Sequence, residues 1–111
     1  MDPKLAPFVV RPTDSLEDAM VLIEANRHRS VVVTDERGVV VGTLSDGDLR
    51  KAILDHRLLS TPVGHVMNTN FLSVGLDERD RGRELLEHEH VFVIPIVDAD
   101  GALVDLVLAY E

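Results

Sequence analysis

Asp35-Glu36-Arg37-Gly38 and Asp98-Ala99-Asp100-Gly101 are the two stretches that decide the fold of this 111-residue chain. Each is an Asp-x-x-Gly turn between two runs rich in β-branched residues. This pattern is typical of a β-hairpin, because glycine supplies the positive φ that such a turn needs. One shift along the chain, from Gly38 to Gly101, relates the two turns. Such self-similarity indicates an internal repeat, so we interpret the chain as two copies of one unit.

The same shift, applied without a gap, also superposes residues far from the turns. The identical pairs are Phe8 with Phe71, Asp14 with Asp77, Leu22 with Leu85, Glu24 with Glu87, and Val41 with Val104. Chance similarity would not keep one register across a whole unit. The sequence therefore predicts one module over residues 1–111, with repeat one at 8–55, a connector at 56–70 and repeat two at 71–111.

Each repeat is predicted to run in the order strand, helix, strand, strand, helix, which makes the fold α/β. In repeat one the strands are expected at 8–10, 30–34 and 39–44, and the last two are expected to be buried on both faces. A capping box formed by Asp14 and Glu17 is predicted to start the first helix, and Ser45 the second, which continues to Asp55. We expect the repeats to be related by an approximate two-fold axis.

Repeat two is predicted to contain a helix at roughly 78–88, and the chain then stops at Glu111, the position equivalent to Asp48. The helix that follows Asp48 in repeat one has no counterpart. We therefore expect this chain to be cut from a longer protein.

The composition excludes several classes of function. Eleven basic and 20 acidic residues give a formal charge of −9, which repels nucleic acids and anionic membranes. There are no cysteines, so disulfides and thiolate sites are excluded. The sequence has neither an apolar run of about 18 residues nor a secretory signal, and we expect a cytoplasmic protein.

The stretch Gly42-Thr43-Leu44-Ser45-Asp46-Gly47-Asp48-Leu49-Arg50 is the best candidate for a binding site. It leads from a strand into a helix N-terminus, where the helix dipole and unpaired amides favour a phosphate. Ser45 can add a hydroxyl donor, and Asp48 can accept hydrogen bonds from ribose hydroxyls. The same stretch is also typical of an ordinary helix cap, and both readings stay open on the residues alone.

This stretch, together with Val66-Met67-Asn68 and Ile94-Pro95-Ile96-Val97-Asp98, resembles the tandem CBS-domain pair, or Bateman module. The form of the motif looks most like the pair that precedes the catalytic domain of bacterial sugar-phosphate nucleotidyltransferases. The resemblance implies a regulatory module that requires no cofactor, binds an adenine nucleotide (AMP, ADP or ATP) and forms a homodimer.

The resemblance also implies roles for individual residues. The phosphate and ribose would be held by Ser45, Asp46, Gly47 and Asp48, and Arg50 would neutralise phosphate charge at the rim. The adenine would lie between strand backbone and apolar side chains, at positions matching Val10 to Thr13 and Val31, Val32 and Val33.

Repeat two departs from the motif, because Leu108, Ala109, Tyr110 and Glu111 stand where repeat one has Ser45, Asp46, Gly47 and Asp48. We therefore expect at most one nucleotide site per chain. The departure also favours an alternative function, a purely structural dimerisation module whose ligand site has decayed. No arrangement of nucleophile and base is found, so we do not expect this chain to be an enzyme or to bind a metal.

Overall fold

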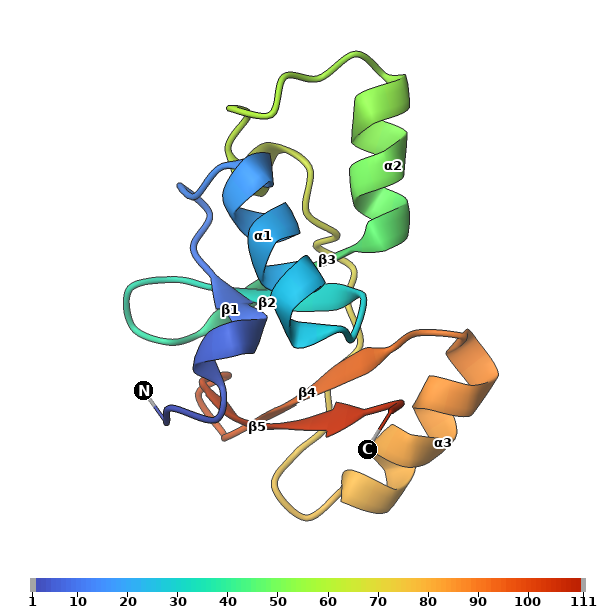
Figure 1. Cartoon of the computed structure of the whole chain (residues 1–111). Helices are drawn as coiled ribbons and strands as arrows, with labels where there is room; N and C mark the ends of the chain where they lie inside the picture. The colour runs from blue at the N-terminus through green and yellow to red at the C-terminus, as the bar shows by residue number, and fades with distance from the viewer. Residues whose placement is uncertain (1, 111) are drawn as a thin grey trace.

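The computed structural model describes residues 2–110 and shows the expected mixed α/β architecture (Figure 1). A three-stranded sheet has the order β1-β2-β3, and a two-stranded sheet pairs β4 with β5. The strands are β1 (Val9–Val10), β2 (Ser30–Thr34), β3 (Val40–Ser45), β4 (Val93–Val97) and β5 (Leu103–Leu108), and the α-helices are α1 (Leu16–Asn26), α2 (Asp46–Leu54) and α3 (Arg79–Glu89). Two short 3₁₀ helices, η1 (Ala6–Phe8) and η2 (Val63–His65), complete the chain.

The two hairpins repeat each other in register. Ser30 pairs with Ser45 in the first hairpin and Val93 with Leu108 in the second, and the shift that relates Gly38 to Gly101 relates these pairs too. Each hairpin also has a bulge at the equivalent position, where the pairing skips Val41 in β3 and Val104 in β5. The turn glycines, Gly38 and Gly101, share a φ of 84°, as the repeated Asp-x-x-Gly pattern predicts.

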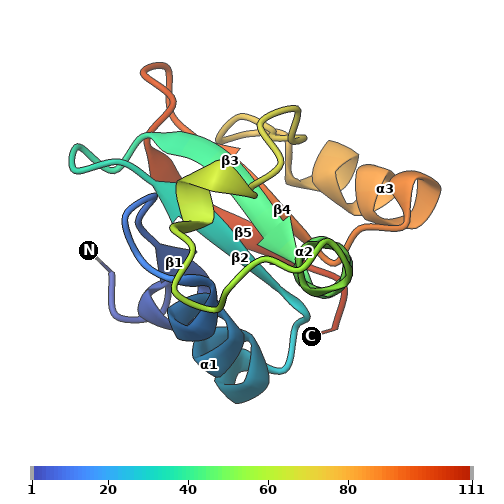
Figure 2. The ribbon, with the colours of Figure 1, turned by 90° about the horizontal axis from the view of Figure 1, so that it is seen from above.

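The two hairpins meet around an approximate two-fold axis. Val39 bridges Ala102 across this axis, and the Val40 amide donates to the Gly101 carbonyl at 3.0 Å. The symmetry-equivalent bond runs from the Leu103 amide to the Gly38 carbonyl at 2.9 Å. Seen from above, the two hairpin loops project side by side (Figure 2). A shared apolar core lies between the hairpins and includes Leu5, Phe8, Val32, Val40, Val93 and Leu106.

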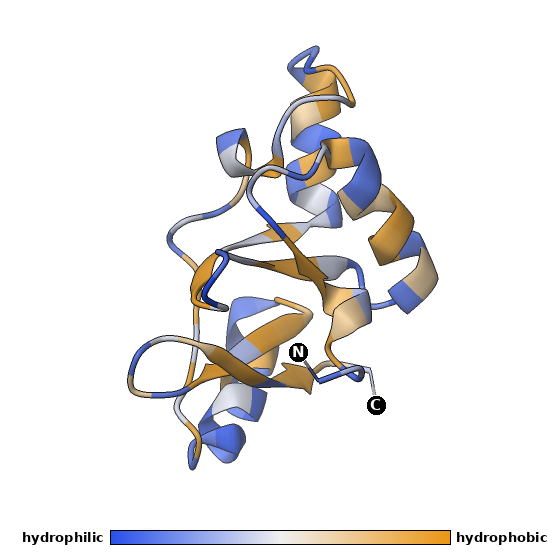
Figure 3. Cartoon of the chain, turned by 90° about the vertical axis from the view of Figure 1, so that its left-hand side faces the viewer, coloured by the Kyte–Doolittle hydropathy of each residue, from blue (hydrophilic) through white to orange (hydrophobic). Residues whose placement is uncertain are grey.

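On the face turned away from the shared core, α1 and α2 cover the first sheet and α3 covers the second. The strands therefore form apolar layers inside the molecule, and the helices carry polar residues on the outside (Figure 3). Helices α1 and α2 bury Ala19, Leu49 and Ala52 against the first sheet. Helix α3 approaches the second sheet closely, because a Cβ at Gly82 would lie 2.8 Å from Val107 Cγ2. Glycine lowers the helix propensity of α3 at this position, but it permits this close contact.

The structure corrects three details of the sequence interpretation, and the first two concern repeat one. Helix α1 is capped by Ser15 and Asp18, whereas the Asp14 carboxylate accepts a hydrogen bond from the Arg11 amide at 2.8 Å. The cap thus lies one position later than predicted, because Ser15 offers the hydroxyl that bonds the N3 amide. Strand β3 alternates between buried and half-buried residues, so it is not buried on both faces as β2 is.

The third correction concerns the start of each repeat. Val10 pairs with Val33 in repeat one, and Val74 bridges Ile96 in repeat two. Val33 and Ile96 are related by the shift that relates the hairpins, but Val74 lies one residue further along the chain than that shift from Val10 predicts. The hydrogen bond from the Gly75 amide to Glu78 repeats the one from Arg11 to Asp14 with the same longer shift. Repeat two therefore lacks a counterpart of Ser15, and α3 has no side-chain cap.

This missing residue makes two of the gapless matches wrong. Phe8 does not correspond to Phe71, and Asp14 corresponds to Glu78 rather than to Asp77. The matches from α1 onward are unaffected, because α1 and α3 begin at positions that the original shift relates.

No helix within residues 2–110 is both long enough and apolar enough to cross a membrane.

Candidate functional site

The predicted motif forms the junction between β3 and α2. Ser45 is the N-cap of α2, and its hydroxyl accepts a hydrogen bond from the Asp48 amide at 3.2 Å. The Asp48 carboxylate in turn accepts from the Ser45 amide at 2.9 Å and from the Ser45 hydroxyl at 3.1 Å. Both side chains thus complete a capping box, which confirms the structural reading of the motif.

This capping box is not by itself the mark of a site, because α1 begins with the same arrangement. Ser15 accepts from the Asp18 amide at 3.1 Å, and Asp18 accepts from the Ser15 amide at 3.1 Å. Ser45 and Asp48 differ from this pair in their surroundings, since they line a large pocket whose lining does not include the α1 pair.

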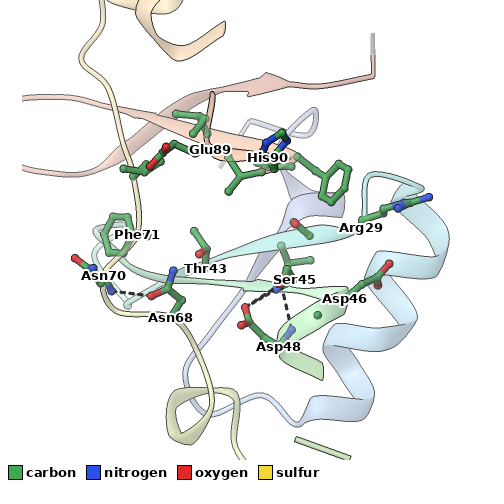
Figure 4. Close-up of a pocket in the computed structure, with 18 of the residues that line it drawn as sticks. Arg29, Thr43, Ser45, Asp46, Asp48, Asn68, Asn70, Phe71, Glu89 and His90 are labelled. Carbon is green, nitrogen blue, oxygen red and sulfur yellow. Dashed lines mark hydrogen bonds between the residues drawn. The ribbon is translucent and has the colours of Figure 1, made fainter. Parts of the chain in front are cut away.

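The pocket has a volume of about 660 Å³, within the usual range for small-molecule sites (Figure 4). Four segments line it, and they come from both repeats and the connector: residues 29–31, 43–50, 68–72 and 89–94. Figure 4 shows Asn68, Asn70 and Phe71 at one end, Arg29 at the other, and Ser45 and Asp48 between them.

The connector reaches the pocket because it pairs with the edge of β3. The Thr43 amide donates to the Asn68 carbonyl at 3.1 Å, and the Asn68 amide donates to the Thr43 carbonyl at 2.8 Å. Gly42 permits this approach, since a Cβ there would lie 2.7 Å from Met67 Sδ. Sequence reasoning placed Met67 and Asn68 in the family motif, but it assigned neither Asn68 nor Asn70 to the site.

The amides at the start of α2 are less available than the sequence suggested. The Asp46 amide donates to the Arg29 carbonyl at 2.9 Å, and the Asp48 amide is held by Ser45. Among the described residues, the Gly47 amide alone of these three has no hydrogen-bond partner. The helix N-terminus therefore offers one free amide to an anion rather than three.

Cationic side chains can supply the rest of the attraction for an anion. Arg29 and Arg50 both line the pocket, and neither forms an ion pair with another described residue. The Arg29 guanidinium lies 5.1 Å from the centre of the Phe92 ring. Three acidic residues, Asp46, Asp48 and Glu89, also line the pocket, so both anion-binding and hydroxyl-binding groups are present.

The structure brings together most of the predicted site residues. Ser45, Asp46, Gly47, Asp48, Arg50 and Val31 all line the pocket. Val10, Thr13 and Val32 do not, because β1 lies on the opposite side of β2 from β3. Val10 belongs to the core beneath α1, and Val32 faces the core between the hairpins. The apolar walls come instead from Phe71, Leu72, Val91, Phe92, Val93 and Ile94.

The equivalent place in repeat two is occupied by the chain's own aromatic side chains. Tyr110, the counterpart of Gly47, stacks on Phe92 with ring centres 5.8 Å apart. The two ring nitrogens of His28 each lie 2.6 Å from a carbonyl oxygen, that of Asn26 and that of Tyr110. His28 is half-buried. Glu111, the counterpart of Asp48, lies outside the described residues.

Within residues 2–110, no group of three or more His, Cys, Asp or Glu side chains is arranged to hold a metal ion.

A curated relative much longer than this chain matches most of its sequence. Arabinose 5-phosphate isomerase GutQ of Salmonella typhi is 34% identical over 90 residues, which are 80% of this chain and 28% of that protein. This chain therefore spans less than a third of that relative's length. The relative is an isomerase, so the expected association with a nucleotidyltransferase is not supported.

A family model and solved structures also match this chain. The CBS domain model matches residues 1–55, which include the β3–α2 motif. A solved structure of CBSX2 in complex with AMP is 31% identical, with a TM-score of 0.71, and the match covers 91% of this chain and 80% of that one. CBSX2 from Arabidopsis thaliana is 30% identical, with a TM-score of 0.72, and the match covers 90% and 78% of the two chains. The chain therefore belongs to the CBS-domain family, and its two repeats form a CBS pair.

Proposed function

We propose that this CBS pair is a regulatory module that binds one adenine nucleotide per chain in the pocket at the start of α2. The ribose hydroxyls would bond to the Asp48 carboxylate oxygen that the capping box leaves free. The phosphate would face the Gly47 amide and the guanidinium groups of Arg29 and Arg50. The base would lie against Phe71 and the apolar wall of β4.

One observation carries this proposal: Ser45 and Asp48 line a pocket that both repeats enclose, whereas the identical capping box at Ser15 and Asp18 does not. A carboxylate, two guanidinium groups without ion-pair partners among the described residues, and an apolar wall match the three parts of a nucleotide. The AMP complex of the similar CBSX2 supports the same ligand class.

We infer further that the module regulates a sugar-phosphate isomerase. The GutQ relative supports this parent, and this chain spans 28% of that relative's length, so a catalytic domain would make up most of the remainder. Nucleotide binding in the pocket would change the activity of such a domain if the protein has two conformational states that bind the nucleotide with different affinities.

The test is calorimetric titration of this chain with AMP, ADP and ATP, using two matched variants. Asp48→Ala breaks the capping box of α2 and Asp18→Ala breaks the equivalent capping box of α1, so each is expected to destabilise the fold by about 1 kcal/mol. We expect Asp48→Ala to abolish nucleotide binding and Asp18→Ala to leave it unchanged. Equal binding by both variants would contradict the proposed role of Asp48, and no binding by the unmodified chain would contradict the proposed function.

A purely structural dimerisation module is the second candidate. Ile53, Leu58 and Leu59 are 47%, 73% and 43% exposed, and such apolar groups favour an interface between copies. Leu49, which is also in α2, does not belong to this group, because it is buried in the core. A dimer in sedimentation analysis that binds none of the three nucleotides would support this candidate over the first.

A further inference from the structure

Arg29 and Phe92 occupy equivalent positions in the two repeats, yet they differ in chemistry and touch each other. The Arg29 guanidinium lies 5.1 Å from the Phe92 ring centre, at a distance typical of a cation–π contact. The symmetry of the fold therefore brings the cation of one repeat onto the aromatic ring of the other, beside the pocket that both residues line.

The backbone of Arg29 is fixed as well. Its φ of 63° is in the left-handed region, which is uncommon for arginine. Its carbonyl accepts a hydrogen bond from the first amide of α2, that of Asp46, at 2.9 Å. The same bond recurs in repeat two, from the Ala109 amide to the Phe92 carbonyl at 3.0 Å. Each residue is thus tied to the strand end of its own repeat.

Phe92 also contacts Tyr110. The two rings stack with centres 5.8 Å apart and an interplanar angle of 29°. Tyr110 in turn is tied through its carbonyl to a ring nitrogen of His28 at 2.6 Å. His28, Tyr110 and Phe92 are thus linked to one another, and the Phe92 ring in turn contacts the Arg29 guanidinium.

We propose that Phe92 and Tyr110 are positioning residues that hold the Arg29 guanidinium at the edge of the pocket, where it meets the phosphate of the nucleotide. This inference rests on the proposed function. The side-chain cluster that replaces the second site would then contribute to ligand binding in the first. Because just one of the three amides at the start of α2 is free among the described residues, the orientation of this guanidinium would matter strongly for the affinity of a phosphorylated ligand.

The test compares AMP with adenosine, which has the same base and ribose but no phosphate. We expect Arg29→Gln to weaken AMP binding about tenfold, as for loss of a hydrogen bond to a charged group, and to leave adenosine binding unchanged. Phe92→Leu keeps an apolar wall, and we expect it to weaken AMP binding about two- to fivefold more than adenosine binding, the factor for an exposed cation–π contact.

Tyr110 lies outside the pocket lining and provides the more remote variant. Tyr110→Leu should weaken AMP binding about twofold, and Tyr110→Phe, which keeps the stacked ring, should restore it. When Arg29→Gln is already present, Phe92→Leu and Tyr110→Leu should each weaken AMP binding no more than they weaken adenosine binding. The reason is that both residues act on the phosphate through Arg29, and the effects of coupled residues are not additive.

The outcomes separate the two proposals. If Phe92→Leu weakens AMP and adenosine equally, or if its effect on AMP persists in the Arg29→Gln background, Phe92 is merely a wall of the pocket and the positioning role is overturned. If the unmodified chain binds neither AMP nor adenosine, the proposed function fails and the positioning role fails with it.

Discussion

Thr34 is the clearest point at which one substitution should stabilise this fold. The residue is fully buried in β2, and its hydroxyl has no hydrogen-bond partner among the described residues. An unsatisfied buried hydroxyl costs about 1–3 kcal/mol. Thr34→Val replaces that hydroxyl with a methyl group of similar size and keeps the β-branched shape. We expect it to remove most of that cost and to raise the free energy of unfolding by a similar amount.

The residue equivalent to Thr34 in repeat two is a valine, which shows that this position accepts valine, and it also offers a control variant. Val97 stands there, after the same bulge, and it is half-buried. Val97→Thr adds a hydroxyl where water can reach it, so its cost should be smaller than the gain from Thr34→Val. In a domain of this size, about 1 kcal/mol corresponds to about 4 °C in Tm, which thermal unfolding followed by circular dichroism can resolve.

A lower Tm for Thr34→Val would refute this reasoning. It would mean that an internal water satisfies the hydroxyl, so that removing the hydroxyl leaves the water without a partner. Urea unfolding with an unchanged m-value would show that any difference in Tm comes from the native state.

Two further predictions concern α3 and its start. Gly82→Ala should gain about 1 kcal/mol in helix propensity but lose about 1–3 kcal/mol to the clash with Val107 Cγ2, so we expect a net loss in chemical unfolding, and an increase in stability would contradict the close contact. Hydrogen bonds from the Gly75 amide and then Arg81 hold the pKa of Glu78 below its ordinary value of 4.5. The folded-state pKa is depressed, so the stabilisation by Glu78 is complete above pH 4.5 and is lost as the pH falls through the lower folded-state value. Glu78→Gln should therefore flatten the acid side of the stability profile below pH 4.5 in urea unfolding, and an unchanged profile would exclude this contribution.

The hairpins were predictable from sequence because their information is local. An Asp-x-x-Gly turn between β-branched runs predicts a hairpin with a positive φ at the glycine, and both hairpins and both glycines confirm this. The start of each repeat was less predictable. A one-residue deletion before α3 leaves the flanking residues similar, and the contacts that reveal it, such as Val74 with Ile96, join segments far apart in the sequence.

The site was predictable in part for the same reason. Ser45 to Arg50 form one contiguous motif at a helix start, and all the predicted members of this stretch line the pocket. The opposite walls come from the connector and from β4, and no local pattern indicates which strand of repeat two faces α2. Val10 and Val32 were predicted from the family resemblance, but β1 lies on the far side of β2 from the motif, and Val32 faces the core between the hairpins.

At the strand ends beside the pocket, the two repeats differ in their side chains rather than in their backbone. The amide-to-carbonyl bond that joins Asp46 to Arg29 has its counterpart between Ala109 and Phe92, so both strand ends are built alike. Gly47 leaves the pocket open, because a Cβ there would meet nothing closer than Ser45 Oγ at 3.6 Å. At the equivalent position the Tyr110 ring packs on Phe92 instead. In repeat two, the aromatic side chains that stand where repeat one has its motif therefore make apolar contacts of their own on the same backbone frame.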